Sequence, residues 1–412
     1  MNFDKYLSQN GSLPEPFRGL IGRDLSVFDT LSTPCFILDE ARLKANANII
    51  REVSERSGAE FLLAQKAFSC FDVYELFRDA AVGTEASGLY EARLGGEEMP
   101  SREVHVYCGA YREEQFEELL RYADHIVFNS IHELARFGRR AKDAGLSVGL
   151  RINPECSTQE GHAIYDPCAP GSRMGVTRGV WEKEMTPELF ELLDGIHFHT
   201  LCEQNSDDLE TTLKAVESLF GPELDQMKWI NFGGGHHVTR SDYDRDRLIH
   251  LVKETKAKYP GIRVYLEPGE AWALNAGYYL THVLDLVENG SVTTAIVDGS
   301  ACCHMPDVLE MPYTPPLLGA VPSDRERREY VFRLAGPTCL AGDVIGEYSF
   351  EEELQEGDLL VFGDMAIYSI VKTNTFNGMP LPSVYLWRED GSMECLASFG
   401  YEDFKRRLGG KV

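Results

Sequence analysis

The sequence predicts an α/β protein in which a TIM-type (β/α)8 barrel is followed by a C-terminal all-β domain. Short apolar runs alternate with helical patterns over roughly 230 residues, which is typical of βαβ units closed into a parallel barrel. Nearly every run ends in polar residues or glycine, and the carboxyl ends of barrel strands are where active sites lie. After about residue 278 the pattern changes to β-like runs separated by Gly, Pro and Asp turns.

The eight barrel strands are expected where β-branched and aromatic residues concentrate. They are residues 61–66, 82–87, 104–110, 125–130, 148–153, 195–200, 228–235 and 264–270. Helices are expected between them, for example over 113–123 and over 132–145, where Gly145 would end the helix.

The β domain is expected to contain further short strands, in residues 293–300, 330–336, 358–363, 368–374 and 383–390. The expected domains are an N-terminal extension over 1–32, the barrel over 33–278 and the β domain over 279–412. A strand at 33–39 could belong to either of the last two.

Composition narrows the classes of partner. The chain has 412 residues with 66 acidic and 40 basic ones, a net charge of −26, which argues against nucleic-acid and anionic-membrane partners. Ten cysteines without CxxC pairs indicate reduced thiols, and no apolar run approaches the ~18 residues of a membrane span. We therefore expect a cytoplasmic protein.

Lys66 ends the apolar run "FLLAQK". A lysine is costly to bury unless it is paired or chemically occupied, although most lysines are simply exposed. Its place at a strand end, among the other polar strand ends, favours a functional group.

Two further strand ends could supply the partners of such a lysine. "NFGGG" places Gly233, Gly234 and Gly235 after the seventh strand, where barrels often bind phosphate, and "LEPGE" places Glu267 and Glu270 after the eighth. Pyridoxal phosphate needs a lysine that attaches it covalently, a phosphate cradle, and an acidic partner for its ring nitrogen. Lys66, the glycines and Glu267 would supply these in order.

A metal site is the alternative for the histidines. "HFHT" places His197 and His199 on one side of a strand, with His236 and His237 nearby in the sequence. This arrangement leaves a metal-dependent barrel hydrolase open, although one packed core histidine would explain it as well.

The β domain also carries candidate groups. Cys339 and Asp343 in "GPTCLAGD" could be a proton donor beside a carboxylate, or a buried turn. Tyr368 could bind a phosphate oxygen or pack in the core.

The chain resembles the carboxynorspermidine/carboxyspermidine decarboxylases. The resemblance rests on ordered motifs from about residue 33 to about 385, among them "LLAQKAFS", "EASGLYEARLG", "YDPCAPGSRMGV", "HFHTLCEQNSD", "NFGGGHH", "LEPGE", "CHMPDVLEMPY", "GPTCLAGDVIGEYSF" and "VKTNTFNG". These are pyridoxal-phosphate enzymes of the alanine-racemase-like fold, related to the ornithine, arginine and diaminopimelate decarboxylases. The resemblance implies a cytoplasmic head-to-tail homodimer with shared active sites that acts on a polyamine precursor in spermidine and norspermidine synthesis.

The resemblance also implies a role for each matching residue. Lys66 would attach the cofactor, His199 would stack on its ring, and Glu267 would pair with the ring nitrogen. The other cofactor contacts would come from Arg151, near the phenolic oxygen, and from Gly234, Gly235 and Tyr368, at the phosphate. Cys339 of the partner subunit would return a proton to the substrate carbon, and no metal ligand is implied.

Two departures from the ornithine-type pattern indicate a longer substrate with several amines. Glu270 stands where those enzymes have an arginine, and Leu340 follows Cys339 where they have an aspartate, with Asp343 further along. We expect Glu270, Asp307 and Asp343 to bind substrate amines. Another basic amino-acid decarboxylase or racemase of this fold, for diaminopimelate, ornithine, lysine or arginine, remains the first alternative, and a silent cofactor-binding protein or metal-dependent hydrolase the more distant one.

Overall fold

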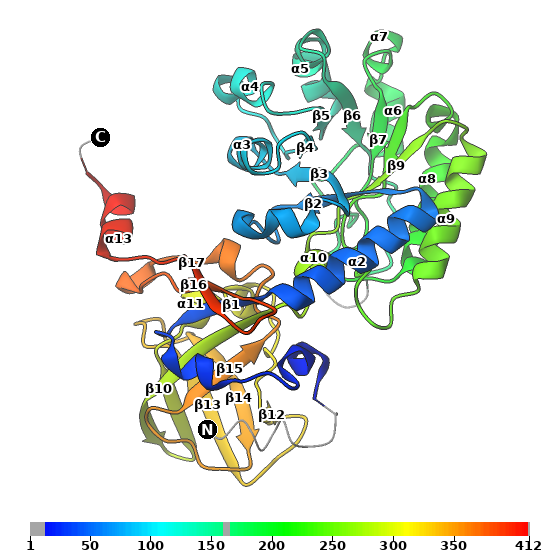
Figure 1. Ribbon diagram of the computed structural model, residues 1–412. Coiled ribbons are helices and arrows are strands. Elements are labelled where there is room, and N and C mark those ends of the chain that lie inside the picture. The colour runs from blue at the N-terminus through cyan, green and yellow to red at the C-terminus, as the bar shows by residue number, and fades with distance from the viewer. Residues whose placement is uncertain (1–12, 160–164, 411–412) are drawn as a thin grey trace. The chain divides into compact units, whose positions relative to one another are not determined.

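The computed structural model describes residues 13–159 and 165–410, and its contacts divide the chain into two units. The barrel unit is Ala45–Trp272, and the sheet unit combines Met1–Lys44 with Ala273–Val412. Figure 1 shows the barrel unit in blue to green and most of the sheet unit in yellow to red. The first 12 residues of the expected N-terminal extension lie outside the described residues.

The barrel unit is built on a closed ring of eight parallel strands, paired in chain order and closed by β2 against β9. The strands are β2 (Glu60–Ala64), β3 (Ala81–Ala86), β4 (Glu103–Tyr107), β5 (His125–Phe128), β6 (Ser147–Arg151), β7 (Gly195–His197), β8 (Trp229–Asn231) and β9 (Arg263–Leu266). Each lies within the run expected for it or starts one residue earlier, which confirms the predicted barrel.

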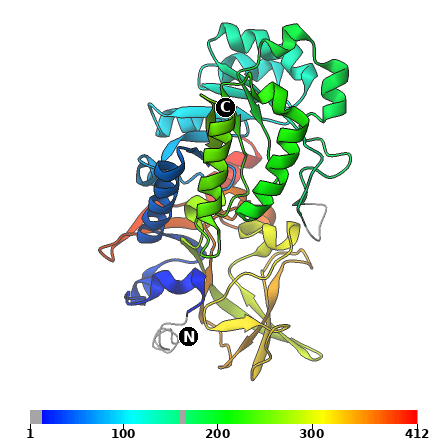
Figure 2. The same cartoon turned by 90° about the vertical axis from the view of Figure 1, so that its right-hand side faces the viewer.

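Helices alternate with the strands along the chain, and Figure 2 shows α8 and α9 on the outside of the ring. They are α2 (Glu40–Ser57), α3 (Leu89–Glu98), α4 (Glu113–Leu119), α5 (Ile131–Asp143), α6 (Arg178–Glu184), α7 (Pro187–Phe190), α8 (Ser206–Leu224), α9 (Arg245–Lys258) and α10 (Glu270–Ala273), with a 3₁₀ helix at Phe71–Phe77. The Ser130 side chain caps α5, and Gly145, with a φ of 88°, follows its end as predicted.

The interior of the barrel is packed around Trp229. A Cβ atom on Gly195 would lie 2.0 Å from the Trp229 indole, and one on Gly149 would lie 2.3 Å from it, so only glycine leaves room for the ring. The Trp229 Nε1–H donates to Ser147 Oγ over 2.8 Å, which satisfies the polar atom of a buried indole. Trp229 is the first residue of β8, so this packing lies towards the N-terminal ends of the strands, away from the ends that carry the site.

In its described part, residues 13–44 and 273–410, the sheet unit contains nine strands. They are β1 (Cys35–Asp39), β10 (Gly277–Asn289), β11 (Val292–Val297), β12 (Ala320–Pro322), β13 (Tyr330–Ala335), β14 (Val344–Phe350), β15 (Leu359–Gly363), β16 (Ser383–Trp387) and β17 (Met393–Ala397). The strand order is β12-β14-β13-β11-β10-β1-β16-β17, with β15 paired to β10. Most pairs are antiparallel, and β1, which the sequence could not assign, is a strand of this sheet.

Short helices and an N-terminal segment complete the sheet unit. The helices are α11 (Ala301–His304), α12 (Asp307–Glu310) and α13 (Tyr401–Leu408), and 3₁₀ helices occur at Glu15–Leu20, Ser26–Thr30, Ile370–Lys372 and Phe376–Gly378. Phe17 and Phe28 are buried in one apolar cluster with Tyr278 and Trp387. The described part of the expected extension is therefore integral to the core of this unit.

The prediction of a strand over residues 368–374 was wrong. Residues 368–374 form a turn and the 3₁₀ helix Ile370–Lys372, because Tyr368 has a φ of 50° and takes the backbone out of the extended conformation. In the described residues, no helix has both the length and the apolar character that crossing a membrane requires.

Candidate active site

Lys66 lies in the turn that directly follows β2 and is half-buried. The neighbouring Gln65 fixes this turn, since its backbone N–H donates to the Glu85 carbonyl over 3.0 Å and its side chain donates to the Glu91 carbonyl over 2.8 Å. The lysine is thus held at the carboxyl end of the barrel by a buried amide.

Glu267 is buried one residue beyond β9 and has two polar neighbours, one from β8 and one from β7. The Asn231 side chain donates to its Oε1 over 2.7 Å, and His197 Nε2 lies 3.0 Å from the same oxygen. Burial by itself would raise the pKa of this carboxyl, but the charges of His197 and Lys66 outweigh it and hold the pKa below its usual value. Glu267 is therefore an ionised acceptor inside the barrel.

Glu85, near the end of β3, has a pKa that is shifted in the opposite direction from that of Glu267. Burial, and then the negative charge of Glu267, raise the pKa of Glu85 above its ordinary value. Two carboxyl groups close together in a buried site cannot both ionise easily, so one is kept neutral. The site combines a neutral acid at Glu85 with an anion at Glu267.

His199 and the glycine loop form one hydrogen-bonded unit. The Gly234 N–H donates to His199 Nδ1 over 2.9 Å. Burial, and then the charges of Lys66 and Arg151, hold the pKa of His199 well below its usual value, so the ring is neutral and can accept this bond. Gly235 has a φ of 79°, and a Cβ there would lie 2.1 Å from the Leu201 carbonyl oxygen, so the loop requires glycine.

Arg151 is buried at the end of β6 and lies beside the same loop region. Its guanidinium donates to the His199 carbonyl over 3.2 Å and lies 4.7 Å from the centre of the Tyr107 ring. These contacts hold the cation next to the residue expected to stack on the cofactor.

The histidine pair of "HFHT" does not converge as metal ligands would. His197 lies against Glu267, whereas His199 accepts from Gly234. Among the described residues, the two groups of His and acidic side chains close enough for a shared ion are Glu103, His105, His125 and Glu203, His237, Glu270, and neither contains the predicted pair.

Glu270 is the first residue of α10, and one of its oxygens accepts a hydrogen bond from His237 Nε2. The barrel unit thus brings together seven predicted residues at the carboxyl ends of its strands: Lys66, Arg151, His199, Gly234, Gly235, Glu267 and Glu270. The other four, Asp307, Cys339, Asp343 and Tyr368, lie in the sheet unit.

Asp343 is buried in the sheet unit, and its oxygens already accept several hydrogen bonds. The donors are Ser300 Oγ at 2.9 Å, Thr338 Oγ1 at 2.7 Å and the Cys302 N–H at 3.2 Å. These contacts anchor the loop that precedes Cys339. Substrate binding by Asp343 stays a prediction.

Cys339 is exposed, and its N–H donates to Asn377 Oδ1 over 2.7 Å. Asp307 forms an ion pair with Lys372, whose ammonium lies 5.8 Å from the centre of the Tyr368 ring. Cys339 is thus accessible, while Asp307 already has a cationic partner.

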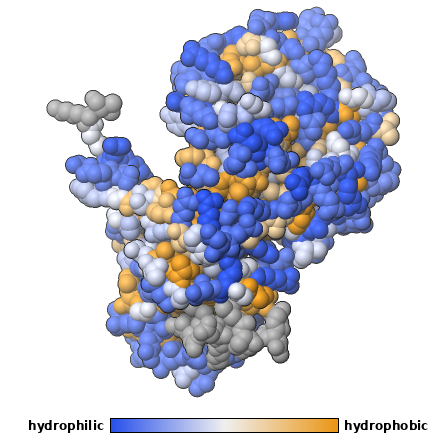
Figure 3. All heavy atoms as spheres, viewed as in Figure 1, coloured by the Kyte–Doolittle hydropathy of each residue, from blue (hydrophilic) through white to orange (hydrophobic). Residues whose placement is uncertain are grey.

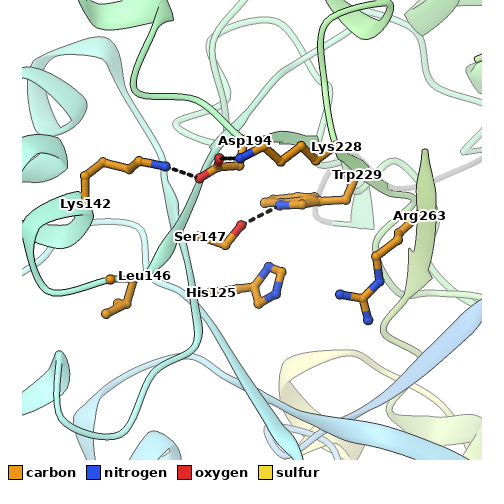
Figure 4. Close-up of a pocket in the computed structure, with 9 residues that line it drawn as sticks. His125, Lys142, Leu146, Ser147, Asp194, Lys228, Trp229 and Arg263 are labelled. Carbon is orange, nitrogen blue, oxygen red and sulfur yellow. Dashed lines mark hydrogen bonds and ion pairs between the residues drawn. The ribbon is translucent and has the colours of Figure 1, made fainter. Parts of the chain in front are cut away.

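A polar cavity of about 350 Å³ lies at the opposite, N-terminal end of the barrel strands (Figure 4). Asp194 accepts from Lys142 Nζ at 2.6 Å and from Lys228 Nζ at 2.7 Å, and Trp229 and Arg263 form the other wall. In barrels this end serves stability. Asp194 directly precedes β7, and its partners lie in α5 and directly before β8, so the two ion pairs tie these three elements together.

Sequence reasoning did not select Glu85 or Asn231 for the site. Glu85 carried a signal, since it ends an expected strand with a polar residue. Asn231 lay inside an apolar run, and its contact with Glu267 depends on the register of β8 against β9, which pairs Asn231 with Tyr265.

Comparisons with known proteins agree with this geometry. Residues 27–366 match the family model described as pyridoxal-dependent decarboxylase, C-terminal sheet domain. The chain is 41% identical to the carboxyaminopropylagmatine decarboxylase of Synechocystis over 92% of this chain and 96% of that protein. It is 39% identical to the carboxynorspermidine/carboxyspermidine decarboxylase of Campylobacter jejuni, over 92% and 99%.

A solved structure is similar as well. The crystal structure of carboxynorspermidine decarboxylase from Campylobacter jejuni, complexed with norspermidine, matches with a TM-score of 0.83 and 38% identity, over 92% of this chain and 100% of that one. Both the sequence and the fold thus match over most of the chain, and the protein belongs to the pyridoxal-dependent decarboxylases, a family of carboxy-lyases.

Proposed function

We propose that the protein uses pyridoxal phosphate to remove the α-carboxylate of carboxynorspermidine or carboxyspermidine, which yields CO2 and norspermidine or spermidine. The observation that carries the proposal is the match, over nearly the full length of both chains, to the decarboxylase that was crystallised with norspermidine. The reaction would be a step of polyamine synthesis.

The residues at the carboxyl end of the barrel fit the cofactor. Lys66 offers the amine for covalent attachment, and Glu267 is a buried anion able to keep a proton on a ring nitrogen. Gly234 and Gly235 would hold the phosphate, since a Cβ on Gly234 would lie 2.6 Å from the Glu267 carbonyl oxygen and close the cradle. Arg151 and Tyr368 would contact the phenolic oxygen and the phosphate.

When bound, pyridoxal phosphate supplies the electron sink that accepts the electron pair left by the departing carboxylate. The chain's own residues perform the remaining tasks. Glu267 would keep a proton on the ring nitrogen, and His199, whose ring is neutral, would lie against the cofactor without adding charge. Cys339 of a second subunit would supply the proton that the substrate carbon takes up, and the Lys66 amine would free the product by attaching the cofactor again.

Carboxylates on both units would bind the substrate's amines. Glu270 opens the short helix α10 beside the barrel mouth, and Asp307 would exchange its Lys372 partner for an amine of the substrate. Asp343 would contribute to amine binding through the loop before Cys339, which it anchors by accepting a hydrogen bond from Thr338.

We also propose a cytoplasmic homodimer with shared active sites. Large apolar side chains gather near Cys339: Leu340, Phe376 and Tyr401 are 44%, 46% and 69% exposed. The hydrogen bonds of Cys339 to Asn377, and of Arg407 to Thr375 over 2.9 Å, link the three segments that carry them. Figure 3 shows apolar patches set among hydrophilic residues on one face of the molecule. Exposed apolar side chains gathered in one place, as near Cys339, support a partner surface.

A second substrate has its own support. The relative at 41% identity is named carboxyaminopropylagmatine decarboxylase, and that substrate has the same reacting end with a guanidinium on its tail. It is therefore a candidate for this chain beside the two carboxylated triamines.

The experiment is a panel of separate incubations. Cofactor-loaded protein receives carboxynorspermidine, carboxyspermidine, carboxyaminopropylagmatine, diaminopimelate, ornithine, lysine or arginine, and the products are identified by mass. Turnover of the carboxylated polyamines, ranked by kcat/KM, is the expected result. Turnover of only a simple amino acid would overturn the substrate assignment and leave the cofactor assignment standing.

A further inference from the structure

The side chain of Asn231 connects the glycine loop to the buried carboxylate of Glu267. Asn231 is the last residue of β8 and is fully buried. Its Nδ2 donates to Glu267 Oε1 over 2.7 Å, and its Oδ1 accepts from the Gly233 N–H over 2.8 Å. These two contacts fix the orientation of the amide, because a flipped amide would face a donor with a donor and an acceptor with an acceptor.

A backbone hydrogen bond closes this arrangement into a ring. The Glu267 N–H donates to the Gly233 carbonyl over 2.9 Å. Gly233 has a φ of 74°, and a Cβ there would lie 2.4 Å from the Phe198 carbonyl oxygen, so its backbone packs closely against the end of β7. The three hydrogen bonds therefore fix the spacing between the first glycine of the loop and the Glu267 carboxylate.

His197 approaches the same carboxylate oxygen from the other neighbouring strand. It is the last residue of β7 and pairs in register with Asn231. Its Nε2 lies 3.0 Å from Glu267 Oε1, and in either charge state of the ring this nitrogen can carry the proton that a carboxylate accepts. The Tyr107 ring stacks on the imidazole with the ring centres 5.4 Å apart, which holds it in place.

The two donors leave the other oxygen of Glu267 for a different partner. In residues 13–159 and 165–410, the hydrogen bond and the ion pair of this carboxylate both go to Oε1. A carboxylate can accept at both of its oxygens, and rotation of this one would break both contacts. Oε2 is therefore the oxygen that is placed to accept from a bound ligand.

We propose that Asn231 is a positioning residue that couples the two cofactor anchors of the barrel. Together with His197 it holds Oε1 of Glu267, so that Oε2 faces the ring nitrogen of the cofactor. Through Gly233 it ties this carboxylate to the loop expected to bind the phosphate. The inference rests on the cofactor assignment in the proposed function and deepens it, because it names the residue that sets one anchor relative to the other.

The test compares three ligands that differ in these anchors. Pyridoxal phosphate offers both, pyridoxal lacks the phosphate, and a deaza analogue of pyridoxal phosphate carries a C–H in place of the ring nitrogen. Equilibrium dialysis against cofactor-free protein gives the three dissociation constants for the wild type and for Asn231→Ala.

Asn231→Ala should raise the dissociation constant of pyridoxal phosphate at least tenfold, because a hydrogen bond to an ionised carboxylate is among the stronger ones. It should raise the constants of pyridoxal and of the deaza analogue by a clearly smaller factor, since each lacks one of the two anchors that the residue couples. An amide that only stabilised the fold would weaken all three ligands by the same factor.

Two variants of His197 make the comparison independent of Asn231→Ala, in case that variant does not fold. His197→Leu removes the second donor to Oε1 and should weaken pyridoxal phosphate and pyridoxal alike, with the affinity of the deaza analogue unchanged. His197→Gln can again place an N–H towards Oε1 and should recover most of the affinity. The matched control is Asn48→Ala, at an exposed position of α2 whose Oδ1 accepts from Arg51.

The outcomes separate this inference from the proposed function. A wild type without a visible absorbance band that borohydride bleaches would overturn the cofactor assignment, and this inference with it. A wild type that binds the cofactor but decarboxylates no polyamine precursor would overturn the proposed substrate and leave this inference standing, because the affinities do not involve a substrate. Equal losses for all three ligands in folded Asn231→Ala or His197→Leu protein would overturn the coupling alone.

Discussion

The substitution Gly234→Ala tests the geometry of the cofactor cradle. The new Cβ would lie 2.6 Å from the Glu267 carbonyl oxygen and 3.1 Å from His199 Cε1, whereas ordinary contacts begin at 3.4 Å. The backbone of Gly234 or Glu267 must therefore move by 0.8 Å, the difference between 3.4 and 2.6 Å. This movement also strains the 2.9 Å hydrogen bond from the Gly234 N–H to His199 Nδ1. A misplacement of about 1 Å in an active site can cost ~100-fold in rate.

We expect Gly234→Ala to weaken pyridoxal-phosphate binding at least tenfold, about 1.4 kcal/mol, and to lower kcat by about 100-fold. The assay titrates cofactor-free protein and follows visible absorbance, with circular dichroism as the check on folding. Gly221→Ala in α8 is the control, because its Cβ would meet only the Tyr259 hydroxyl at 3.7 Å. A folded Gly234→Ala protein that binds the cofactor like the wild type would refute the reasoning.

Three other changes test separate parts of the account. Trp229→Ala should lower the free energy of unfolding by about 3–5 kcal/mol in denaturant titrations, because it removes a buried indole from the barrel interior; a loss below 1 kcal/mol would contradict that packing. Burial, and then the charge of His105, lower the pKa of His125 to about 2, so only the unfolded chain takes up its proton below pH 6.5. His125 should therefore cost about 1.4 kcal/mol of stability per pH unit as pH falls below 6.5, and His125→Asn, unlike the exposed His250→Asn, should flatten the pH profile of unfolding. Cys339→Ser should lower kcat without changing cofactor affinity, and an unchanged kcat would remove the proposed proton donor.

The barrel was predictable because its signal is local. Each strand is a short β-rich run that ends in a polar residue, and the eight runs recur with helical patterns between them. The same reasoning placed Lys66, His199 and Glu267 at strand ends. It failed at residues 368–374, where Ile370 and Val371 suggest a strand but the left-handed Tyr368 redirects the backbone.

Contacts between residues far apart in the chain could not be predicted from the sequence. Whether β1 pairs with β10 and β16 depends on residues more than two hundred positions apart, and no local pattern encodes such a pairing. The protonation states of Glu85 and Glu267 likewise follow from burial and from neighbours on other strands. Motif positions can be read from the chain, whereas the electrostatics of the site require the fold.

The central claim is that Lys66 holds the cofactor for decarboxylation of a carboxylated polyamine. The most direct measurement gives carboxynorspermidine with an isotopically labelled carboxylate to wild-type and Lys66→Ala protein side by side, and follows labelled CO2 and norspermidine by mass. We predict one CO2 for each norspermidine from the wild type and no turnover from Lys66→Ala. Release of CO2 by Lys66→Ala at a rate near that of the wild type would contradict the account.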